Sequence, residues 1–325
     1  MKYVSLPDNL NRPLPFYLAM EEWLARNFNE DFFFTWQVDP TVICGRNQIV
    51  DLEVDIDFCR KNSINICRRK SGGGCVFADR KNIMFSYITN STSVTTDFIA
   101  YTSRIAGVLR QLGIDASSSS RNDILIGEQK VSGNAFYHIP ECSRSIVHGT
   151  MLYDMDSDIM NRALTPSRAK LASKGVKSVA ARVTTITAHS DISLPDFKTF
   201  VRKSLCGNDE FILTAENIVE INTLAEELMT DSWIFRKTSA SRMVRTSRID
   251  GCGEFRTELE IDNGVLLSVN LAGDYFPLAD IDSALLNRLR NIPYKHQSII
   301  DALGDIDTGN IISGITTADF VKLII

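Results

Sequence analysis

Short apolar runs of β type, interrupted by a few helical stretches, most constrain how this 325-residue chain can fold. Residues 32–38, 41–44 and 145–153 have the composition and length of strands, whereas residues 96–112 repeat apolar side chains at helical spacing. This mixture predicts an α+β fold, in which a large domain has mainly antiparallel or mixed sheets flanked by helices.

A hairpin is the strongest local signal in the last third of the chain. Residues 255–261 and 265–271 are two β-type runs that flank Asp262-Asn263-Gly264. Asn-Gly supplies the positive φ angles that a two-residue turn requires. A similar pattern in residues 124–131 predicts a second hairpin.

The length of the chain and one change in composition predict two domains. At about 150 residues per domain, the chain is long enough for two. Residues 231–248 are rich in Ser, Thr and Arg, lack clear periodicity and are interpreted as the linker. We therefore expect a large domain of residues 1–246. A small α+β accessory domain, with the hairpin and three short helices, is expected over residues 247–325.

Charge, hydropathy and cysteine content argue against several functional classes. The net charge of −5 does not favour nucleic acid or an anionic membrane as a partner. The apolar runs are too short to span a bilayer, and Pro7 and Asp8 interrupt the N-terminal stretch where a signal peptide needs apolar residues. A cytoplasmic protein is therefore expected. Seven cysteines without a C-x-x-C pair favour neither a disulfide framework nor a structural zinc site.

A run of cations followed by glycines is the most informative motif. It reads Arg68-Arg69-Lys70-Ser71-Gly72-Gly73-Gly74-Cys75-Val76-Phe77. Glycines let backbone N–H groups approach an anion closely, and Arg and Lys add charge-assisted contacts to phosphate or carboxylate. The run matches neither standard nucleotide-binding glycine motif, and a triple glycine is also typical of a flexible surface loop. By itself, it leaves both interpretations open.

A lysine and a histidine occupy two further strand-like stretches. Lys130 follows Asn122-Asp123 and precedes Ser132-Gly133. A fixed ammonium there is suited to stabilising the negative charge that develops when an acyl carbonyl is attacked. The run His148-Gly149-Thr150 begins another strand. Taken alone, Lys130 is also explained as an exposed hairpin lysine, and His148 as a buried, hydrogen-bonded histidine.

In this order, the three stretches resemble the lipoate–protein ligase A family. Residues 42–48 look like the family's I-G-R-N-Q turn, and residues 170–179 look like its K-L-x-S-K-G-V-x-S-V segment. The C-terminal hairpin, Gly273-Asp274-Tyr275-Phe276 and the three short helices are similar to the family's accessory domain. The resemblance covers nearly the whole chain.

The resemblance implies an ATP-dependent ligase that works in two steps. Lipoate and ATP, with Mg²⁺, form lipoyl-AMP and pyrophosphate, and a lysine of an acceptor protein then takes the lipoyl group and releases AMP. Lys130 corresponds to the essential catalytic residue, and Asp123 to a candidate metal ligand. The family's acceptors are lipoyl domains of 2-oxoacid dehydrogenases and the glycine-cleavage H protein, and a monomer is expected. The residues assigned to acyl-adenylate and ATP binding are Arg69, Ser71, Gly72, Gly73, Gly74, Val76, Phe77, Asn122, Asp123, Lys130, Ser132, Gly133, His148, Gly149 and Thr150.

The chain departs from the family pattern at three positions. Ala78, Lys81 and Ala180 replace a histidine, a glycine and an arginine. We expect Ala78 to enlarge or depolarise part of the pocket. Cys75 invites comparison with octanoyltransferases that use a cysteine nucleophile, but no partner base is evident, and a small strand residue facing the core is expected.

Three alternative functions follow from these departures and from the superfamily. An acyltransferase could move octanoyl or lipoyl groups from a carrier protein without ATP. A degenerate binding protein would hold lipoate or its adenylate without transfer. A biotin ligase would be expected to carry a G-R-G-R-x-G type loop, and this chain has Arg69-Lys70-Ser71-Gly72-Gly73-Gly74 instead.

Overall fold

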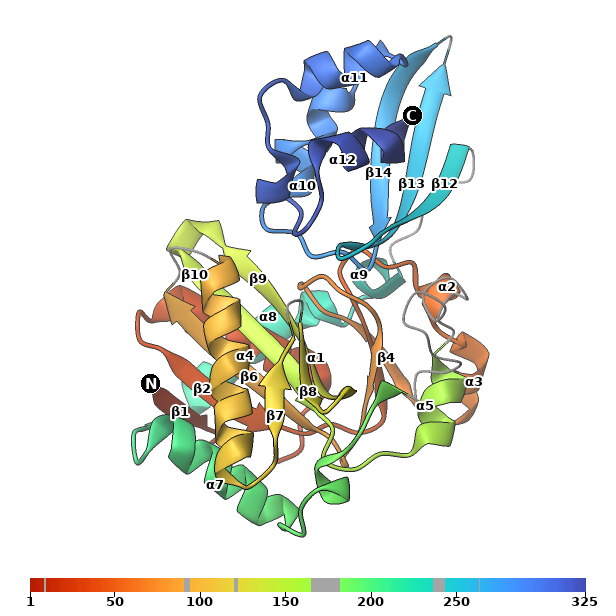
Figure 1. Ribbon diagram of the computed structural model, residues 1–325. Helices are drawn as coiled ribbons and strands as arrows, with labels where there is room; N and C mark the ends of the chain where they lie inside the picture. The colour runs from red at the N-terminus through yellow and green to blue at the C-terminus, as the bar shows by residue number, and fades with distance from the viewer. Residues whose placement is uncertain (9, 91–93, 120–121, 165–181, 236–242, 263) are drawn as a thin grey trace.

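The computed structural model describes residues 1–8, 10–90, 94–119, 122–164, 182–235, 243–262 and 264–325 (Figure 1). Its centre is an eight-stranded sheet in which β1 is parallel to β2 and β11, and the other neighbours are antiparallel. The predicted mixed, mainly antiparallel sheet is therefore confirmed. The strand order is β11 (Glu210–Ile212), β1 (Lys2–Ser5), β2 (Phe32–Trp36), β6 (Ile83–Asn90), β10 (Arg144–Met151), β9 (Gln129–Ile139), β8 (Asp123–Ile126) and β7 (Ala116–Ser118).

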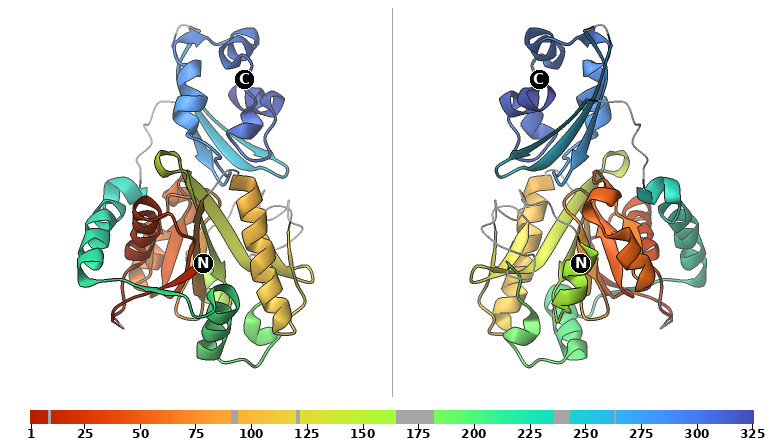
Figure 2. Two further views of the ribbon diagram at one scale, coloured as in Figure 1. Left: turned by 90° about the vertical axis from the view of Figure 1, so that its left-hand side faces the viewer. Right: turned by 90° about the vertical axis from the view of Figure 1, so that its right-hand side faces the viewer.

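Helices cover both faces of this sheet (Figure 2). Helices α1 (Leu14–Asn27) and α8 (Ala215–Leu228) lie on one face, and α4 (Val94–Gln111) and α7 (Leu194–Cys206) lie on the other. Side chains of a strand alternate between faces, so Phe32 and Phe34 pack in the core beneath α1, whereas Phe33 packs in the core beneath α4. Both faces are apolar, which explains why the Phe32–Phe34 run is uninterrupted.

A smaller three-stranded sheet lies beside the large one. Its order is β4 (Asn65–Arg68), β3 (Thr41–Cys44) and β5 (Val76–Ala78), with β3 parallel to β4 and antiparallel to β5. The short helices α2 (Val50–Glu53), α3 (Ile56–Lys61) and α5 (Ser157–Ala163) accompany this sheet, and apolar side chains from β3, β5, α3 and α5 share one core cluster. The run of cations and glycines connects β4 to β5, so its ends are fixed by the two outer strands of one sheet, on either side of β3.

The C-terminal domain has a sheet and a core of its own. The sheet contains β12 (Met243–Ile249), β13 (Gly253–Asp262), β14 (Val265–Gly273) and β15 (Ile292–Pro293), and it packs against α10 (Ile281–Ala284), α11 (His296–Leu303) and α12 (Thr317–Ile324). The predicted hairpin is confirmed, because Asp262 pairs with Val265 and Gly264 has a φ of 76°. In Figure 1 this domain lies above the large sheet.

The segment interpreted as a linker contains regular structure at both ends. Residues Asp231–Phe235 form α9, and β12 begins at Met243. Within the ranges given above, no helix has the length and apolar character needed to cross a membrane.

Candidate active site

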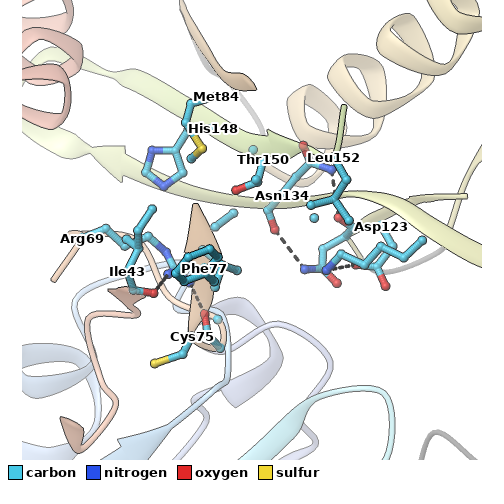
Figure 3. Close-up of a pocket in the computed structure, with 18 of the residues that line it drawn as sticks. Ile43, Arg69, Cys75, Phe77, Met84, Asp123, Asn134, His148, Thr150 and Leu152 are labelled. Atoms are coloured by element: carbon cyan, nitrogen blue, oxygen red, sulfur yellow. Dashed lines mark hydrogen bonds and ion pairs between the residues drawn. The ribbon is translucent and has the colours of Figure 1, made fainter. Parts of the chain in front are cut away.

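A cavity of about 190 Å³ lies between the large sheet, the three-stranded sheet and the C-terminal domain (Figure 3). Its walls combine an apolar stretch with a few polar groups. Asp123 lies toward one end of the cavity, and Arg69 and His148 lie toward the other (Figure 3). The apolar lining consists of Leu18, Trp36, Ile43, Val76, Phe77, Met84, Leu152, Met160 and Leu164. Such a lining suits a ligand that has an alkyl chain and a charged head group.

Arg69 is a buried cation at the cavity wall. Its side chain is held by oxygens alone, because Nη1 donates to Ile43 O at 3.0 Å, and Nη2 donates to the carbonyls of Gly72 and Gly74 at 2.6 and 2.8 Å. Burial lowers the pKa of Arg69 to about 10, so the guanidinium is still charged at neutral pH. Among the described residues no carboxylate forms an ion pair with it, and the charge is therefore available to an anion in the cavity.

A relay of hydrogen bonds connects Arg69 to a buried carboxylate on α1. Arg69 Nε donates to Ser71 Oγ at 3.0 Å, and Ser71 Oγ lies 2.6 Å from His148 Nε2. On the other side of the ring, His148 Nδ1 lies 2.9 Å from Glu21 Oε2. The Glu21 carboxylate, which is 0% exposed, also accepts from the hydroxyl of Ser86. All of these bonds are satisfied when His148 carries its proton on Nδ1, so the relay fixes the orientation of the ring and of Ser71.

At the other end of the cavity, Lys130 forms an ion pair with Asp123. Lys130 Nζ lies 2.9 Å from Asp123 Oδ1, and Arg182 Nη2 contacts Asp123 Oδ2. The three residues come from different segments: β9, the start of β8 and the chain beyond residue 181. The N–H of Thr184 donates to Lys130 O at 2.9 Å, which attaches that last segment to β9. The Asp123 carboxylate therefore holds two cations side by side at the cavity.

The hairpin of β8 and β9 determines where the Lys130 ammonium lies. A register shift follows Ile124, so that Leu125 faces Lys130 although Ile124 faces Ser132. Bulges of this kind re-aim side chains. The ammonium packs directly over Gly133, where an added Cβ would lie 2.2 Å from Lys130 Nζ. Only glycine leaves room for the lysine in this position.

The C-terminal domain closes the cavity at the glycine loop. The N–H of Gly73 donates to Tyr275 O at 3.1 Å, and the N–H of Gly273 donates to Asn47 O at 2.7 Å. Phe276 stacks on Phe136 of β9, with 5.7 Å between ring centroids and an interplanar angle of 15°. Phe276 and Asp274 both line the cavity. Gly72 lies so close that an added Cβ would meet Tyr275 O at 2.4 Å.

The sequence over residues 13–206 matches the family model described as the lipoyl protein ligase A/B catalytic domain. The chain belongs to the lipoate–protein ligase family. Residues 238–324 match a second model, the bacterial lipoate protein ligase C-terminus. Lipoate–protein ligase 1 of Staphylococcus aureus is 30% identical over 332 aligned positions, which cover 99% of each chain. Lipoate–protein ligase LplJ of Bacillus subtilis is 29% identical and covers 98% of each chain.

Solved structures of similar proteins share the fold. P. falciparum LipL1, solved in complex with lipoate, superposes with a TM-score of 0.77 at 20% identity and covers 99% of this chain and 97% of its own. A lipoate–protein ligase A bound with ATP gives a TM-score of 0.62 at 25% identity, over 72% of this chain and 98% of its own. The bi-partite ligase of Thermoplasma acidophilum, described with its E2 lipoyl domain, gives 0.64 at 25% identity over 74% and 98%.

Most residues that the family resemblance assigned to the site line this one cavity. Three do not. Ser71 is buried and hydrogen-bonds His148, which lines the cavity. Gly72 packs against the C-terminal domain, and Ser132 donates to Asn134 Oδ1. Those that line it are Arg69, Gly73, Gly74, Val76, Phe77, Asn122, Asp123, Lys130, Gly133, His148, Gly149 and Thr150.

Sequence reasoning missed several residues that line the cavity or support its wall. Glu21 carried a usable signal, because this carboxylate lies on the same apolar helix face as Leu18 and Leu24. Arg182 and Phe276 stand in stretches that resemble the family but were not assigned to the site, and both line the cavity. Cys75, which was expected to face the core, is only half-buried and lines the cavity.

The three departures from the family pattern have different positions. Ala78 is fully buried in the core beneath α1 and is not among the residues that line the cavity. Lys81 is an exposed turn residue whose Nζ lies 3.5 Å from Asp154 Oδ2. Ala180, like the motif over residues 170–179, falls outside the described residues. The expectation that Ala78 enlarges the cavity therefore receives no support from its position.

Asp123 does not fit Mg²⁺ in this arrangement. Both of its oxygens pair with cations, Lys130 and Arg182, and a divalent ion would have to displace them. Across the described ranges, no group of three or more His, Cys, Asp and Glu side chains is placed to hold a metal ion.

Proposed function

We propose that this ligase activates lipoate with ATP and transfers the lipoyl group to a lysine of an acceptor protein. The observation that carries the proposal is the pair of cations at the two ends of an apolar cavity. Arg69 offers a buried guanidinium without an acidic partner among the described residues, and Lys130 offers a fixed ammonium. An acyl-adenylate provides partners for both features, since its alkyl chain suits the apolar lining and its carbonyl and phosphate suit the cations.

In the first step, a lipoate carboxylate oxygen attacks the α-phosphorus of ATP, and pyrophosphate leaves. The cations offset the charge that builds up around the phosphorus. In the second step, the neutral amine of an acceptor lysine attacks the acyl carbonyl. An amide forms, a proton is released from the amine, and AMP carries away the electron pair. Lys130 is the group we assign to the carbonyl oxygen in that step.

The other components of the proposal follow from the family. Lipoyl domains and the glycine-cleavage H protein are the proposed acceptors. We also propose that the protein is a monomer and works in the cytoplasm. Mg²⁺ is proposed to enter with the phosphates of ATP, because Asp123 is engaged by two cations. We also propose that residues 1–246 and 247–325 form separate domains. The division is supported by the separate core of the C-terminal sheet and helices.

The test is a reaction with lipoate, ATP and an isolated lipoyl domain, followed by AMP release and by the intact mass of the acceptor. AMP and a lipoylated acceptor are expected together, and neither is expected when ATP is omitted. Transfer from an octanoylated carrier protein without ATP would instead identify an acyltransferase. Lipoate binding without AMP or transfer would identify a binding protein.

A further inference from the structure

Two cysteines lie against each other at the edge of the cavity. Cys75 Sγ donates a hydrogen bond to Cys44 Sγ across 3.3 Å. The antiparallel register of β3 and β5 pairs Ile43 with Val76, and one further step along both strands places Cys44 opposite Cys75. Directly opposed residues of an antiparallel pair have Cα atoms about 4.5–5.5 Å apart, which is within the range that a disulfide spans.

The two thiols differ in access. Cys44 is buried, whereas Cys75 is half-buried and lines the cavity. A small molecule in the cavity can therefore reach Cys75 first, and Cys44 is placed behind it to react second. This order is that of an attacking thiol and a resolving thiol.

The surroundings favour a thiolate at Cys44. The hydrogen bond from Cys75 lowers the pKa of Cys44; burial opposes this shift, and the nearby Arg68 and Arg69 guanidinium groups add to it. At three other cysteines burial is not outweighed. It raises the pKa values of Cys59, Cys67 and Cys206 to about 11, 12 and 11. Cys44 is therefore chemically distinct from these buried thiols.

We propose that Cys44 and Cys75 form a reversible thiol-modification site that reacts with small disulfides entering the cavity. Cys75 passes its proton across the hydrogen bond to the Cys44 thiolate, and the Cys75 sulfur attacks one sulfur of the disulfide RSSR. A Cys75–S–S–R mixed disulfide forms, and the released RS⁻ takes the proton from Cys44. The Cys44 sulfur then attacks Cys75 Sγ and displaces the second RS⁻. One RS⁻ leaves with the proton of Cys75, and the other takes a proton from water. The pair loses two electrons and RSSR gains them.

Cross-linking changes the wall of the cavity. A disulfide holds its sulfurs about 2.0 Å apart, so the two Sγ atoms must move together by about 1 Å. Arg69 Nη2 donates to the carbonyl of Gly74, the residue next to Cys75, at 2.8 Å. Movement of Cys75 therefore shifts a carbonyl that holds the Arg69 guanidinium. We assign lower ligand affinity and slower turnover to the oxidised form. This consequence, unlike the chemical step, rests on the proposed ligase function.

The experiment treats the full-length protein with 2-hydroxyethyl disulfide, and in a second arm with lipoate, whose dithiolane is a cyclic disulfide. Trypsin places Cys44 in residues 27–46 and Cys75 in residues 71–80, each as the single cysteine of its peptide. The expected product is these two peptides joined by a disulfide, with two of the seven thiols lost and both regained with dithiothreitol. A linked product in one arm alone identifies which class of disulfide reaches the pair.

Two variants make the result specific. Cys44→Ala lacks the second thiol, so it should stop at the mixed disulfide on Cys75. Cys142→Ser removes a half-buried thiol away from the cavity and should cross-link as the wild type does. The proposal is overturned if the linked peptide is absent in both arms, or if Cys142 reacts as fast as Cys75. Neither readout depends on ligase activity.

Turnover is then compared between the oxidised and reduced forms of each protein. For the wild type and Cys142→Ser, the rate should fall by at least about tenfold on oxidation, as expected for a misplacement near 1 Å. An unchanged rate in the cross-linked protein would overturn the assigned consequence and leave the proposed ligase function standing.

Discussion

Lys130 Nζ lies 2.9 Å from Asp123 Oδ1, so the ammonium assigned to the acyl carbonyl is held by an acidic partner before any ligand enters. The side chain of Asp123 is 7% exposed, and it joins two strands of one hairpin through this contact. A long lysine side chain loses considerable freedom when it is fixed, and here that ordering precedes ligand binding.

Replacement of Lys130 should abolish most activity without unfolding the protein. For Lys130→Ala we expect AMP release to fall by about 100- to 1,000-fold, because a single charge-stabilising group is lost. Lys81→Ala is the matched control, since Lys81 is an exposed lysine on a turn outside the cavity, and its rate should equal that of the wild type. Stopped-flow or end-point AMP assays and thermal melts measure both effects. Equal rates for the two variants would remove Lys130 from the mechanism.

Gly133→Ala should displace the lysine without changing its charge. The added methyl group would lie 2.2 Å from Lys130 Nζ, so the ammonium must move. We expect a loss in turnover of about 10- to 100-fold, from misplacement of a reacting group. Gly107→Ala in α4 is the control, because its Cβ would meet no described atom closer than 3.7 Å. That control should keep full activity and gain helix stability of about 0.5–1 kcal/mol.

Glu21→Gln tests the relay that ends at Arg69. The amide keeps the shape of the carboxylate but cannot accept at both oxygens, so one bond to His148 or Ser86 is lost in a fully buried site. We expect the free energy of unfolding to fall by about 1–3 kcal/mol and the KM for lipoate or ATP to rise. Glu226→Gln, on the exposed surface of α8, should change neither quantity. A stability loss with unchanged KM would assign Glu21 a purely structural role.

Stability should depend on pH through Glu22, which connects α1 to the cationic loop. Burial raises the pKa of Glu22, but ion pairs with Lys70 and Arg26 outweigh it and hold the pKa below the usual 4.5. A lowered folded-state pKa stabilises the protein above about pH 4.5, and this contribution is lost as the pH falls through the lowered value. Glu22→Gln should therefore cost about 1 kcal/mol at pH 7 and progressively less below pH 4.5.

Urea unfolding of wild type and Glu22→Gln between pH 3 and 7 measures this dependence. Glu227→Gln, which is exposed on α8, supplies a control with the same change of net charge. A difference between wild type and Glu22→Gln that stays constant down to pH 3 would exclude titration of Glu22 as its origin.

The sequence was most informative where structure is determined locally. The hairpin at residues 255–271 depends on an Asn-Gly turn, and α4 depends on apolar spacing; both signals lie within a few residues of their effects. Local motifs likewise predicted Lys130, His148 and the glycine loop. The relay through Glu21 and the opposition of Cys44 and Cys75 depend on strand register and on contacts across the chain. No local pattern encodes those relationships, so they appeared only in three dimensions.

The stacking of Phe276 on Phe136 has a consequence for how ligand preference is inherited. The C-terminal segment forms one wall of the cavity, and that wall touches Phe136 on β9, the strand that also carries Lys130. A chimera that joins the first 246 residues of one relative to the end of another would therefore not keep the cavity of either parent. Sequence divergence in the smaller domain can therefore change which ligand the cavity prefers while the residues around Lys130 stay the same.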